Sequence, residues 1–416
     1  MNLNLFIAKK IKGTGIASVS NGIACASVAV SIIVMLTAIA VSGGFKKEIG
    51  EKAVGFTGEI VLTAPGLDYM NDSHEVGADL SYSSDILALE PVISMNPVAY
   101  RPGMLKTDQE VHGAVFKGVD SVYSLDFYKD FITRGRLPYF GGKRMSDEIL
   151  ISQRLADMMG YGVGDAVTAY FVGERVRVRR FEVAGLYDIE LEGVDEKLVL
   201  ADVRQIRRLN GWDEDGASCI EIFLGGDGSQ ASAERRMETA VQIGNIIMDK
   251  MNLAADDPVV PERVEDIYPN LFDWLALLDL NVAMVLGLMI AVAGFNMISG
   301  LLIILFEKIS MIGLLKALGM RTRDICKVFL ARGGAIVLKG MLIGNAIGIP
   351  LLMAQKYLKL ISLSPENYFV DSVPVSLTFS SVIVLNVAAF VLMMLVMTIP
   401  SVFISRVSPE RTIKVS

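Results

Sequence analysis

The sequence predicts an α-helical membrane protein with four transmembrane helices and a large α/β extracytoplasmic domain. The chain of 416 residues is 52% hydrophobic and has a mean hydropathy of +0.47, which is more apolar than soluble domains usually are. It contains four apolar runs, each long enough for the roughly 20 helical residues that cross a hydrocarbon core. A long segment between the first two runs instead contains strand-like alternation separated by turn residues.

We expect the transmembrane helices at residues 22–42, 280–306, 328–353 and 377–404. Lys9, Lys10 and Lys12 precede the first run, as basic residues precede a secretory signal. The run is longer than the roughly 7–15 apolar residues of a signal, so we interpret it as a retained span. In the head, residues 1–21, the stretch 3–12 suits an amphipathic helix on the membrane surface, with an ordinary basic flank as the alternative.

The distribution of basic residues predicts the orientation of the chain. The head, the connection 307–327 and the tail 405–416 carry an excess of lysine and arginine, which places them in the cytoplasm. The segment 43–279 holds 24 lysines and arginines against 41 aspartates and glutamates, a net charge of −17, within a chain whose overall charge is −7. We therefore expect this segment and the shorter loop 354–376 outside the cytoplasm, and no binding of nucleic acid by the acidic surface.

The outer segment has the pattern of a mixed α/β domain. Its strand-like stretches are residues 58–64, 148–152, 165–172, 175–187, 197–201 and 218–224. Helical stretches are expected at residues 153–159, 203–209 and 231–251. Glycine-rich turn signals separate these elements, and a link rich in proline and acidic residues, 254–270, leads toward the second span.

Small residues recur every four positions in the third span, at Gly340, Gly344 and Gly348. Without side chains at this spacing, two helices can approach closely inside a bilayer, so we predict a helix-packing face. Its partner is either a neighbouring span of the same chain or a second protomer.

Polar groups are rare within the spans. The conspicuous ones are Asn296, Asn345 and Asn386, and we expect each to form hydrogen bonds across helices. We find no pair of aspartate or glutamate residues within a span, which argues against an ion-coupled carrier.

No catalytic, metal-binding or cofactor-binding pattern is visible. The chain lacks a GxxxxGK[ST] phosphate-binding loop. His74 and His112 belong to no metal-ligand spacing. Cys25, Cys219 and Cys326 fall in three different predicted compartments, so we expect no intrachain disulfide. We therefore predict a protein that is not an enzyme.

The connection 307–327 is too polar to span a bilayer and too apolar for a plain loop. Ile309, Ile312, Leu315 and Leu318 follow helical spacing, and Gly319 suits a helix stop. An amphipathic helix of this kind can dock in a groove on a cytoplasmic partner. The alternative is a helical hairpin that rests on the membrane.

This connection resembles a known family. The residues Glu307 and Lys308 followed by IGLLKALG, residues 312–319, are similar to the motif after the second span of FtsX-like ABC permeases, especially the lipoprotein-releasing LolC/LolE type. The segments SGGFKKEIGEKAVGFTGEIVL, FKGVDSVYSLDFYKDFITRGRLP and EILISQRLADMMGYGVGDAVTAYFV resemble that type, as does the closing IPSVFISRVSPERTIK. The likeness therefore touches the head, outer domain, spans and tail.

The resemblance implies half of a type VII (MacB-like) ABC transporter, with a separate cytoplasmic ATPase that binds ATP and Mg²⁺. The coupling helix would lie within 309–318, and the residues expected to connect with the ATPase are Glu307, Lys308, Ile312, Leu315, Lys316, Ala317, Leu318 and Gly319. The partner protomer would be a second copy or a related paralogue.

The resemblance also implies how the outer domain is built and used. It would contain a porter-like lobe, about 50–120 and 215–270, and an inserted lobe, about 121–214, above a stalk formed by the first two spans. ATPase motion would be transmitted to this domain, which would release lipoproteins from the outer face of the inner membrane. A periplasmic carrier would be captured by a loop for which residues 187–197 are the candidate, with a plain solvated loop as the alternative.

Three other functions stay open on the sequence. The outer domain could relay ATPase motion to an envelope partner such as a cell-wall hydrolase. The chain could instead be an export component of a tripartite pump. It could also be a membrane-anchored scaffold without an ATPase.

Overall fold

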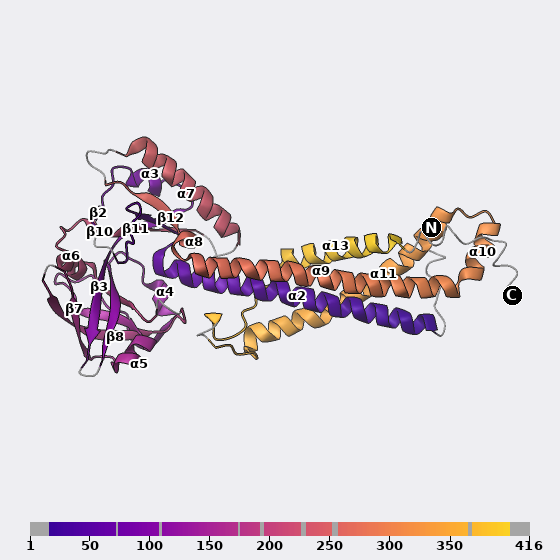
Figure 1. Ribbon diagram of the computed structural model, residues 1–416, viewed down its shortest axis with the longest axis horizontal. Helices are drawn as coiled ribbons and strands as arrows, with labels where there is room; N and C mark the ends of the chain where they lie inside the picture. Colours follow the sequence, from indigo (N-terminus) through magenta and orange to yellow (C-terminus); the bar gives the residue numbers. More distant parts are fainter. Residues whose placement is uncertain are drawn as a thin grey trace. The chain divides into compact units, whose positions relative to one another are not determined.

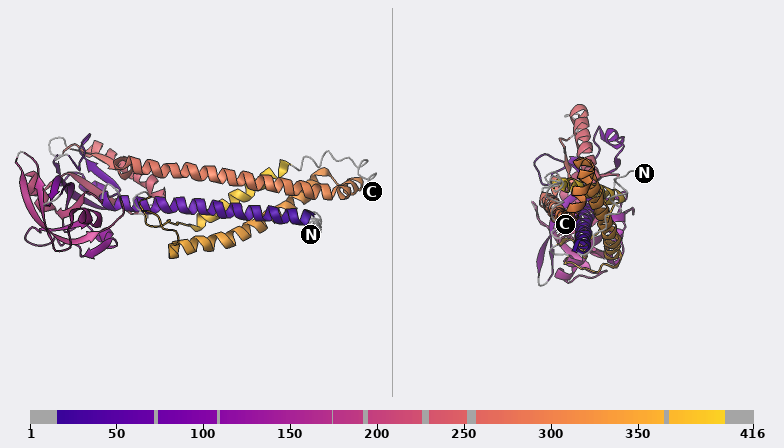
Figure 2. Two further views of the ribbon diagram at one scale, coloured as in Figure 1. Left: turned by 60° about the horizontal axis from the view of Figure 1, so that its bottom comes forward. Right: turned by 90° about the vertical axis from the view of Figure 1, so that its right-hand side faces the viewer.

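The computed structural model divides the chain into two compact units (Figures 1 and 2). The residues it describes are 16–71, 74–107, 110–173, 175–191, 195–225, 230–251, 257–364 and 368–399. The helical unit comprises residues 1–45, 274–361 and 373–416, and the outer unit comprises 46–273 and 362–372. The amphipathic helix predicted for residues 3–12 and the cytoplasmic tail lie outside the described residues.

Four helices are long and apolar enough to cross a membrane within the described part of the chain. They are α2 (Ile16–Thr57), α9 (Pro269–Glu307), α11 (Thr322–Leu358) and α13 (Phe379–Val396). Three of them exceed the predicted spans. α2 continues past residue 42, α9 begins ahead of residue 280, and α11 extends beyond residues 328–353 at both ends. Pro269 occupies the first position of α9, where a missing N–H costs nothing. No other proline interrupts α2 or α9.

The glycine stripe of α11 packs against α2 within the same chain. A Cβ atom added at Gly340 would lie 2.8 Å from the Cys25 carbonyl oxygen, and one at Gly344 would lie 2.8 Å from the Ala29 carbonyl oxygen. At Gly348 the nearest atom would be Leu36 Cδ1, at 3.3 Å. The stripe therefore lets two helix backbones approach closely, and its face is occupied inside the chain.

The predicted hydrogen bonds of the span asparagines are confirmed. Asn296 of α9 donates to the Ser27 hydroxyl of α2 at 2.6 Å. Asn345 of α11 and Asn386 of α13 exchange side-chain hydrogen bonds of 2.7 and 3.1 Å. Neutral amides thus join two pairs of helices, α9 with α2 and α11 with α13, without placing a charge in the bilayer.

The outer unit is built from twelve described strands and six described helices. The strands are β1 (Ile60–Thr63), β2 (Val76–Gly77), β3 (Val92–Lys106), β4 (Val111–Val119), β5 (Ile132–Gly135), β6 (Glu148–Ser152), β7 (Ala166–Phe171), β8 (Arg177–Tyr187), β9 (Leu198–Asp202), β10 (Gly216–Ala217), β11 (Cys219–Leu224) and β12 (Val260–Arg263). The helices are α3 (Ser83–Leu87), α4 (Asp126–Lys129), α5 (Gln153–Met159), α6 (Val203–Asn210), α7 (Gln230–Lys250) and α8 (Val264–Ile267). All six predicted strands and all three predicted helical stretches are present.

The first lobe is an antiparallel sheet in the order β12-β1-β11-β3. Helices α3 and α7 pack on one of its faces (Figure 1). Ile60 and Ile222 project from the sheet into the same apolar core as Ile243 and Ile247 of α7. Alternate residues of these strands reach this core because successive side chains point to opposite faces.

The second lobe is a closed ring of strands. The pairings β3-β4, β4-β9, β9-β6, β6-β8, β8-β7 and β7-β3 return to the starting strand. The ring encloses a core that includes Leu105, Phe116, Phe171, Phe181 and Val199. Closing a sheet in this way satisfies the backbone groups of edge strands.

This ring corrects the predicted boundary between the lobes. The inserted lobe was expected to begin near residue 121, but the ring includes β4 and the second half of β3. Without these strands the ring would be open between β9 and β7. Residue 99, where β3 changes partner from β11 to β4, is therefore a better boundary than residue 121.

The candidate carrier loop, residues 187–197, is mostly packed against the domain, within its described residues 187–191 and 195–197. Ile189 and Leu191 are buried in the core below it. Glu190 accepts a hydrogen bond from Lys52 of α2. The described apolar residues therefore anchor the loop to the domain, and capture of a carrier by this loop stays a prediction.

Candidate functional site

A short helix, α10 (Ile309–Ala317), follows α9 at a sharp joint. α9 ends at Glu307, and Lys308 has φ −104° and ψ 21°, outside regular helical geometry. The Lys308 ammonium pairs with the Glu307 carboxylate at 3.0 Å. The two residues predicted to anchor this end of the span therefore form the corner between the two helices.

Gly319 ends α10 as its sequence predicts. It has φ +88°, a left-handed conformation that costs glycine little. The N–H of Gly319 donates to the Lys316 carbonyl and that of Met320 donates to the Leu315 carbonyl, both at 3.0 Å. This pair of bonds is the Schellman motif, which satisfies the last carbonyl groups of a helix.

The side chains predicted to dock a partner do not all lie on one exposed face of α10. Ile312 is fully buried in the core of the helical unit, and Leu315 packs against that core. The side chains of Ile312 and Leu315 therefore face the helical unit rather than solvent. Lys316 is half-buried.

The opposite face of α10 is exposed. Leu314 is 58% exposed and Leu318 is 76% exposed, and Ala317 is also exposed. Because positions three and four apart share one face of a helix, these three residues form one apolar surface. We call Leu314, Ala317 and Leu318 the coupling surface. The sequence did not distinguish the two faces because nearly every position of ISMIGLLKA is apolar or small.

A buried ion pair joins the two lobes of the outer unit to the end of α2. Lys117 of β4 and Glu221 of β11 are 2.8 Å apart, and both side chains are fully buried. The Lys117 ammonium also donates to the Phe56 carbonyl in the last turn of α2 and to the Tyr123 hydroxyl. Glu221 Oε1 also accepts from the Tyr100 hydroxyl at 2.9 Å, and Oε2 accepts from the Tyr123 hydroxyl at 2.9 Å.

This ion pair is well satisfied, as a buried charge must be. Burial raises the pKa of Tyr100 and of Tyr123 well above the ordinary value, so both remain neutral hydrogen-bond donors. The sequence contained no signal for the pair, because its members are far apart in the chain and occupy ordinary strand positions.

Lys52 forms a second link on α2. Its largely buried ammonium pairs with Glu190 at 3.1 Å and donates to the Phe369 carbonyl at 3.0 Å. Phe369 belongs to the loop between α11 and α13, which groups with the outer unit. One lysine therefore ties α2 to two separate loops.

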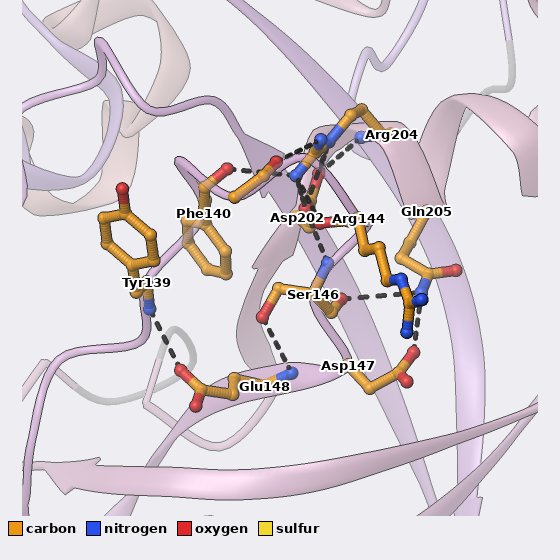
Figure 3. A network of polar contacts seen from close by, with 10 residues as sticks. Tyr139, Phe140, Arg144, Ser146, Asp147, Glu148, Asp202, Arg204 and Gln205 are labelled. Atoms are coloured by element: carbon orange, nitrogen blue, oxygen red, sulfur yellow. Dashed lines mark hydrogen bonds and ion pairs between the residues drawn. The ribbon is translucent and has the colours of Figure 1, made fainter.

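A polar network centred on Arg204 organises a loop of the second lobe (Figure 3). Asp202 caps α6 by accepting from the Arg204 N–H at 2.9 Å, and it pairs with the Arg204 guanidinium at 2.6 Å. The guanidinium also donates to the carbonyls of Phe140, Gly142 and Arg144.

Beside this network lies an open cleft of about 970 Å³. Its charged lining is mixed, with cations such as Arg144 and Arg208 facing acids such as Asp147 and Glu214. Asp147 accepts from Gln205 at 2.7 Å, as Figure 3 shows. We interpret the network as structural, because its polar groups satisfy one another. In the described part of the chain, no three His, Cys, Asp or Glu residues are grouped as metal ligands.

Comparisons with known proteins agree with this architecture. Residues 283–409 match the family described as FtsX-like permease C-terminal. The chain is 22% identical to a lipoprotein-releasing system transmembrane protein LolC of Xylella fastidiosa, over 93% of this chain and 92% of the relative. It is 22% identical to a protein of the same name in Neisseria meningitidis, over 97% and 96%.

Among solved structures, the periplasmic region of MacB from Actinobacillus actinomycetemcomitans matches 51% of this chain and 90% of its own length. The identity is 13% and the TM-score is 0.33. The family match covers α11, α13 and the coupling surface, whereas the LolC matches also include the outer unit. The chain is therefore similar to the FtsX-like permease family over residues 283–409 and to LolC and LolE along nearly its whole length, and it is a multi-pass protein of the inner membrane.

Proposed function

We propose that this chain is the permease subunit of a type VII ABC transporter that releases lipoproteins from the outer face of the inner membrane. The observation that carries the proposal is the similarity to lipoprotein-releasing proteins over nearly the whole of both chains. A match confined to the membrane domain would support only the general permease class.

The energy would come from a separate cytoplasmic ATPase, which binds ATP and Mg²⁺. The coupling surface supports this role, because it exposes two leucines next to cations such as Arg321 and Arg323. An apolar helix face with neighbouring positive charge suits a groove that has an acidic rim. Glu307 and Lys308 would hold the corner that presents α10, and Ile312 and Leu315 would attach α10 to the helical unit.

Transmission to the outer unit would use the long helices. α2 is uninterrupted from Ile16 to Thr57. Lys117 donates to the Phe56 carbonyl in its last turn, and Lys52 of α2 donates to the Phe369 carbonyl. A helix whose end is fixed by buried charge transmits displacement better than one joined by a flexible linker. Gly340, Gly344 and Gly348 would keep α11 in register with α2 during this motion. The transporter would be completed by a second protomer, either another copy or a related paralogue.

The partner is tested by co-purification of the full-length protein with ABC ATPases from its own cells. We expect the double variant Leu314→Asp and Leu318→Asp to lose the ATPase, because two carboxylates would be buried in its groove. Val122→Asp is the matched control, since Val122 is a 79% exposed apolar residue of the outer unit. Retention of the ATPase by the double variant would contradict the coupling surface.

The cargo is tested by depleting the protein and fractionating the envelope. We expect lipoproteins to accumulate in the inner membrane. If lipoproteins are sorted normally while cell separation fails, a relay to a cell-wall hydrolase is the correct function. If only drug susceptibility changes, the export role is correct, and either result rejects lipoprotein release.

A further inference from the structure

The outer unit contains a cavity that none of the roles above uses. It has a volume of about 230 Å³ and lies between the end of α2 and strands β3, β4 and β9. Phe56, Tyr100, Val115 and Leu198 supply apolar or aromatic walls. Tyr268, which directly precedes α9, also lines it.

A cavity of this size is unusual in a packed domain. Protein interiors contain few voids larger than a water molecule. A cavity of ~150 Å³ with apolar walls is already large enough to bind a small hydrocarbon. The cavity is therefore large enough to accept a small hydrocarbon group.

The mouth of the cavity differs from its walls. Lys197 and Asn71 line it and are exposed, so the cavity opens to solvent beside them. Among the nine lining residues, Lys197 is the only one that carries a charge. Its backbone is fixed, since the Lys197 carbonyl accepts from the Val115 N–H at 2.8 Å. The charged residue thus lies at the exposed side of a cavity whose other walls are mostly apolar or aromatic.

We infer that this cavity binds one apolar chain end of an anionic amphiphile. The walls would hold the hydrocarbon and Lys197 would contact a carboxylate or phosphate head. The volume is below the ~300–1,000 Å³ of pockets for drug-sized molecules, so a single chain end fits and a whole lipid does not. The site does not depend on the cargo proposed above.

The cavity lies next to the buried ion pair of Lys117 and Glu221. Phe56 lines the cavity, and its carbonyl accepts from Lys117. Tyr100 also lines the cavity, and its hydroxyl donates to Glu221. A bound chain end would therefore contact two residues of the junction that holds α2.

The test uses the full-length protein in phospholipid nanodiscs with dodecanoic acid that carries a diazirine at its methyl end. After irradiation, we expect mass spectrometry to locate labels on the peptides of β3, β4 and β9. Val115→Trp fills the cavity and should lower this labelling about tenfold, which corresponds to a tenfold loss of affinity. Val111→Trp, at an exposed position of the same strand, is the matched control.

A second variant avoids any disturbance of the core. Lys197→Glu changes only the exposed mouth, and should weaken labelling by the fatty acid while strengthening labelling by the corresponding diazirine alkylamine. A phospholipid with the same diazirine distinguishes the sources, since labelling by it indicates one chain of a membrane lipid rather than a free fatty acid. Equal labelling of the Val115→Trp and Val111→Trp proteins, or labels confined to the spans, would overturn the proposal.

Discussion

The two units of this protein bury polar groups in different ways. The outer unit encloses full charges, with Lys117 and Glu221 completely buried. The helical unit instead joins its helices through glycine contacts and neutral amide pairs such as Asn345 with Asn386. A sheet domain can surround an ion pair with hydroxyl and carbonyl groups, whereas a charge within a bilayer has few such partners.

The two units therefore differ in what determines how their elements pack together. In the outer unit, one buried network determines how three elements meet. In the helical unit, shape determines which helix faces touch, because lipid removes the hydrophobic drive for association. The following predictions, ordered from the largest expected effect, test this difference.

The largest effect is expected from breaking the buried ion pair. Lys117→Met leaves the Glu221 carboxylate without its cation, which typically costs ~3–5 kcal/mol. Hydrogen exchange of β4 and β11 peptides in the full-length protein measures the loss of protection. Lys129→Met removes an exposed partner of Asp126 and serves as the control, with no measurable change expected. Similar protection in both variants would show that the pair does not hold the lobes together.

A smaller effect is expected from filling the glycine stripe. Gly344→Val places a Cβ atom 2.8 Å from the Ala29 carbonyl oxygen and from Ile32 Cβ, and overpacking of this kind costs about 1–3 kcal/mol. Thermal unfolding in detergent measures it. Gly287→Val is the matched control, since no atom lies within 4 Å of its added Cβ. If Gly287→Val is equally damaging, crowding against α2 is not the cause.

The outer unit should also lose stability as the pH rises. Burial raises the pKa of Glu59 to about 7 and that of Asp195 to about 7. Both carboxyls are therefore protonated in the folded state where they would already be ionised in the unfolded chain. Their stabilising contribution is complete below the unfolded pKa of ~4 and is lost as the pH rises through 7.

Between pH 6 and pH 8 we expect each carboxyl to account for about 1 kcal/mol of this loss. Urea unfolding of the full-length protein at the two pH values, followed through Trp212 fluorescence, measures it. Glu59→Gln and Asp195→Asn should each flatten the dependence. An unchanged slope in the double variant would mean that other groups titrate.

The smallest effect is expected from the amide pair of the helical unit. Asn345→Leu removes its bonds to Asn386, and hydrogen bonds between membrane helices are worth ~0.6 kcal/mol on average. A double-mutant cycle with Asn386→Leu in detergent isolates this energy. A coupling as large as the loss in Lys117→Met would remove the proposed distinction between the two units.

The sequence alone determined the elements whose pattern is local. Apolar runs of sufficient length predicted the four spans, and period-two alternation predicted strand β8. Gly319 predicted the end of α10. These features depend on short-range sterics and on the hydrophobicity of nearby side chains. Both can be read from a short window of the sequence.

The sequence did not reveal β3 and β4, the two strands at the centre of the outer unit. β3 contains Pro97 and Pro102, and β4 contains Gly113 and Gly118, all of which are turn signals. Pro97 pairs only with β11 and Pro102 only with β4 among the described strands. Each proline is tolerated because its other edge needs no ladder hydrogen bond.

Only the tertiary structure decided which residues of α10 are free for a partner and which residues hold the end of α2. Ile312 and Leu314 are equally apolar, and the difference between them is set by contacts with helices distant in the chain. The pairing of Lys117 with Glu221 likewise depends on two strands meeting. Burial and long-range pairing are properties of the whole fold, so no local pattern encodes them.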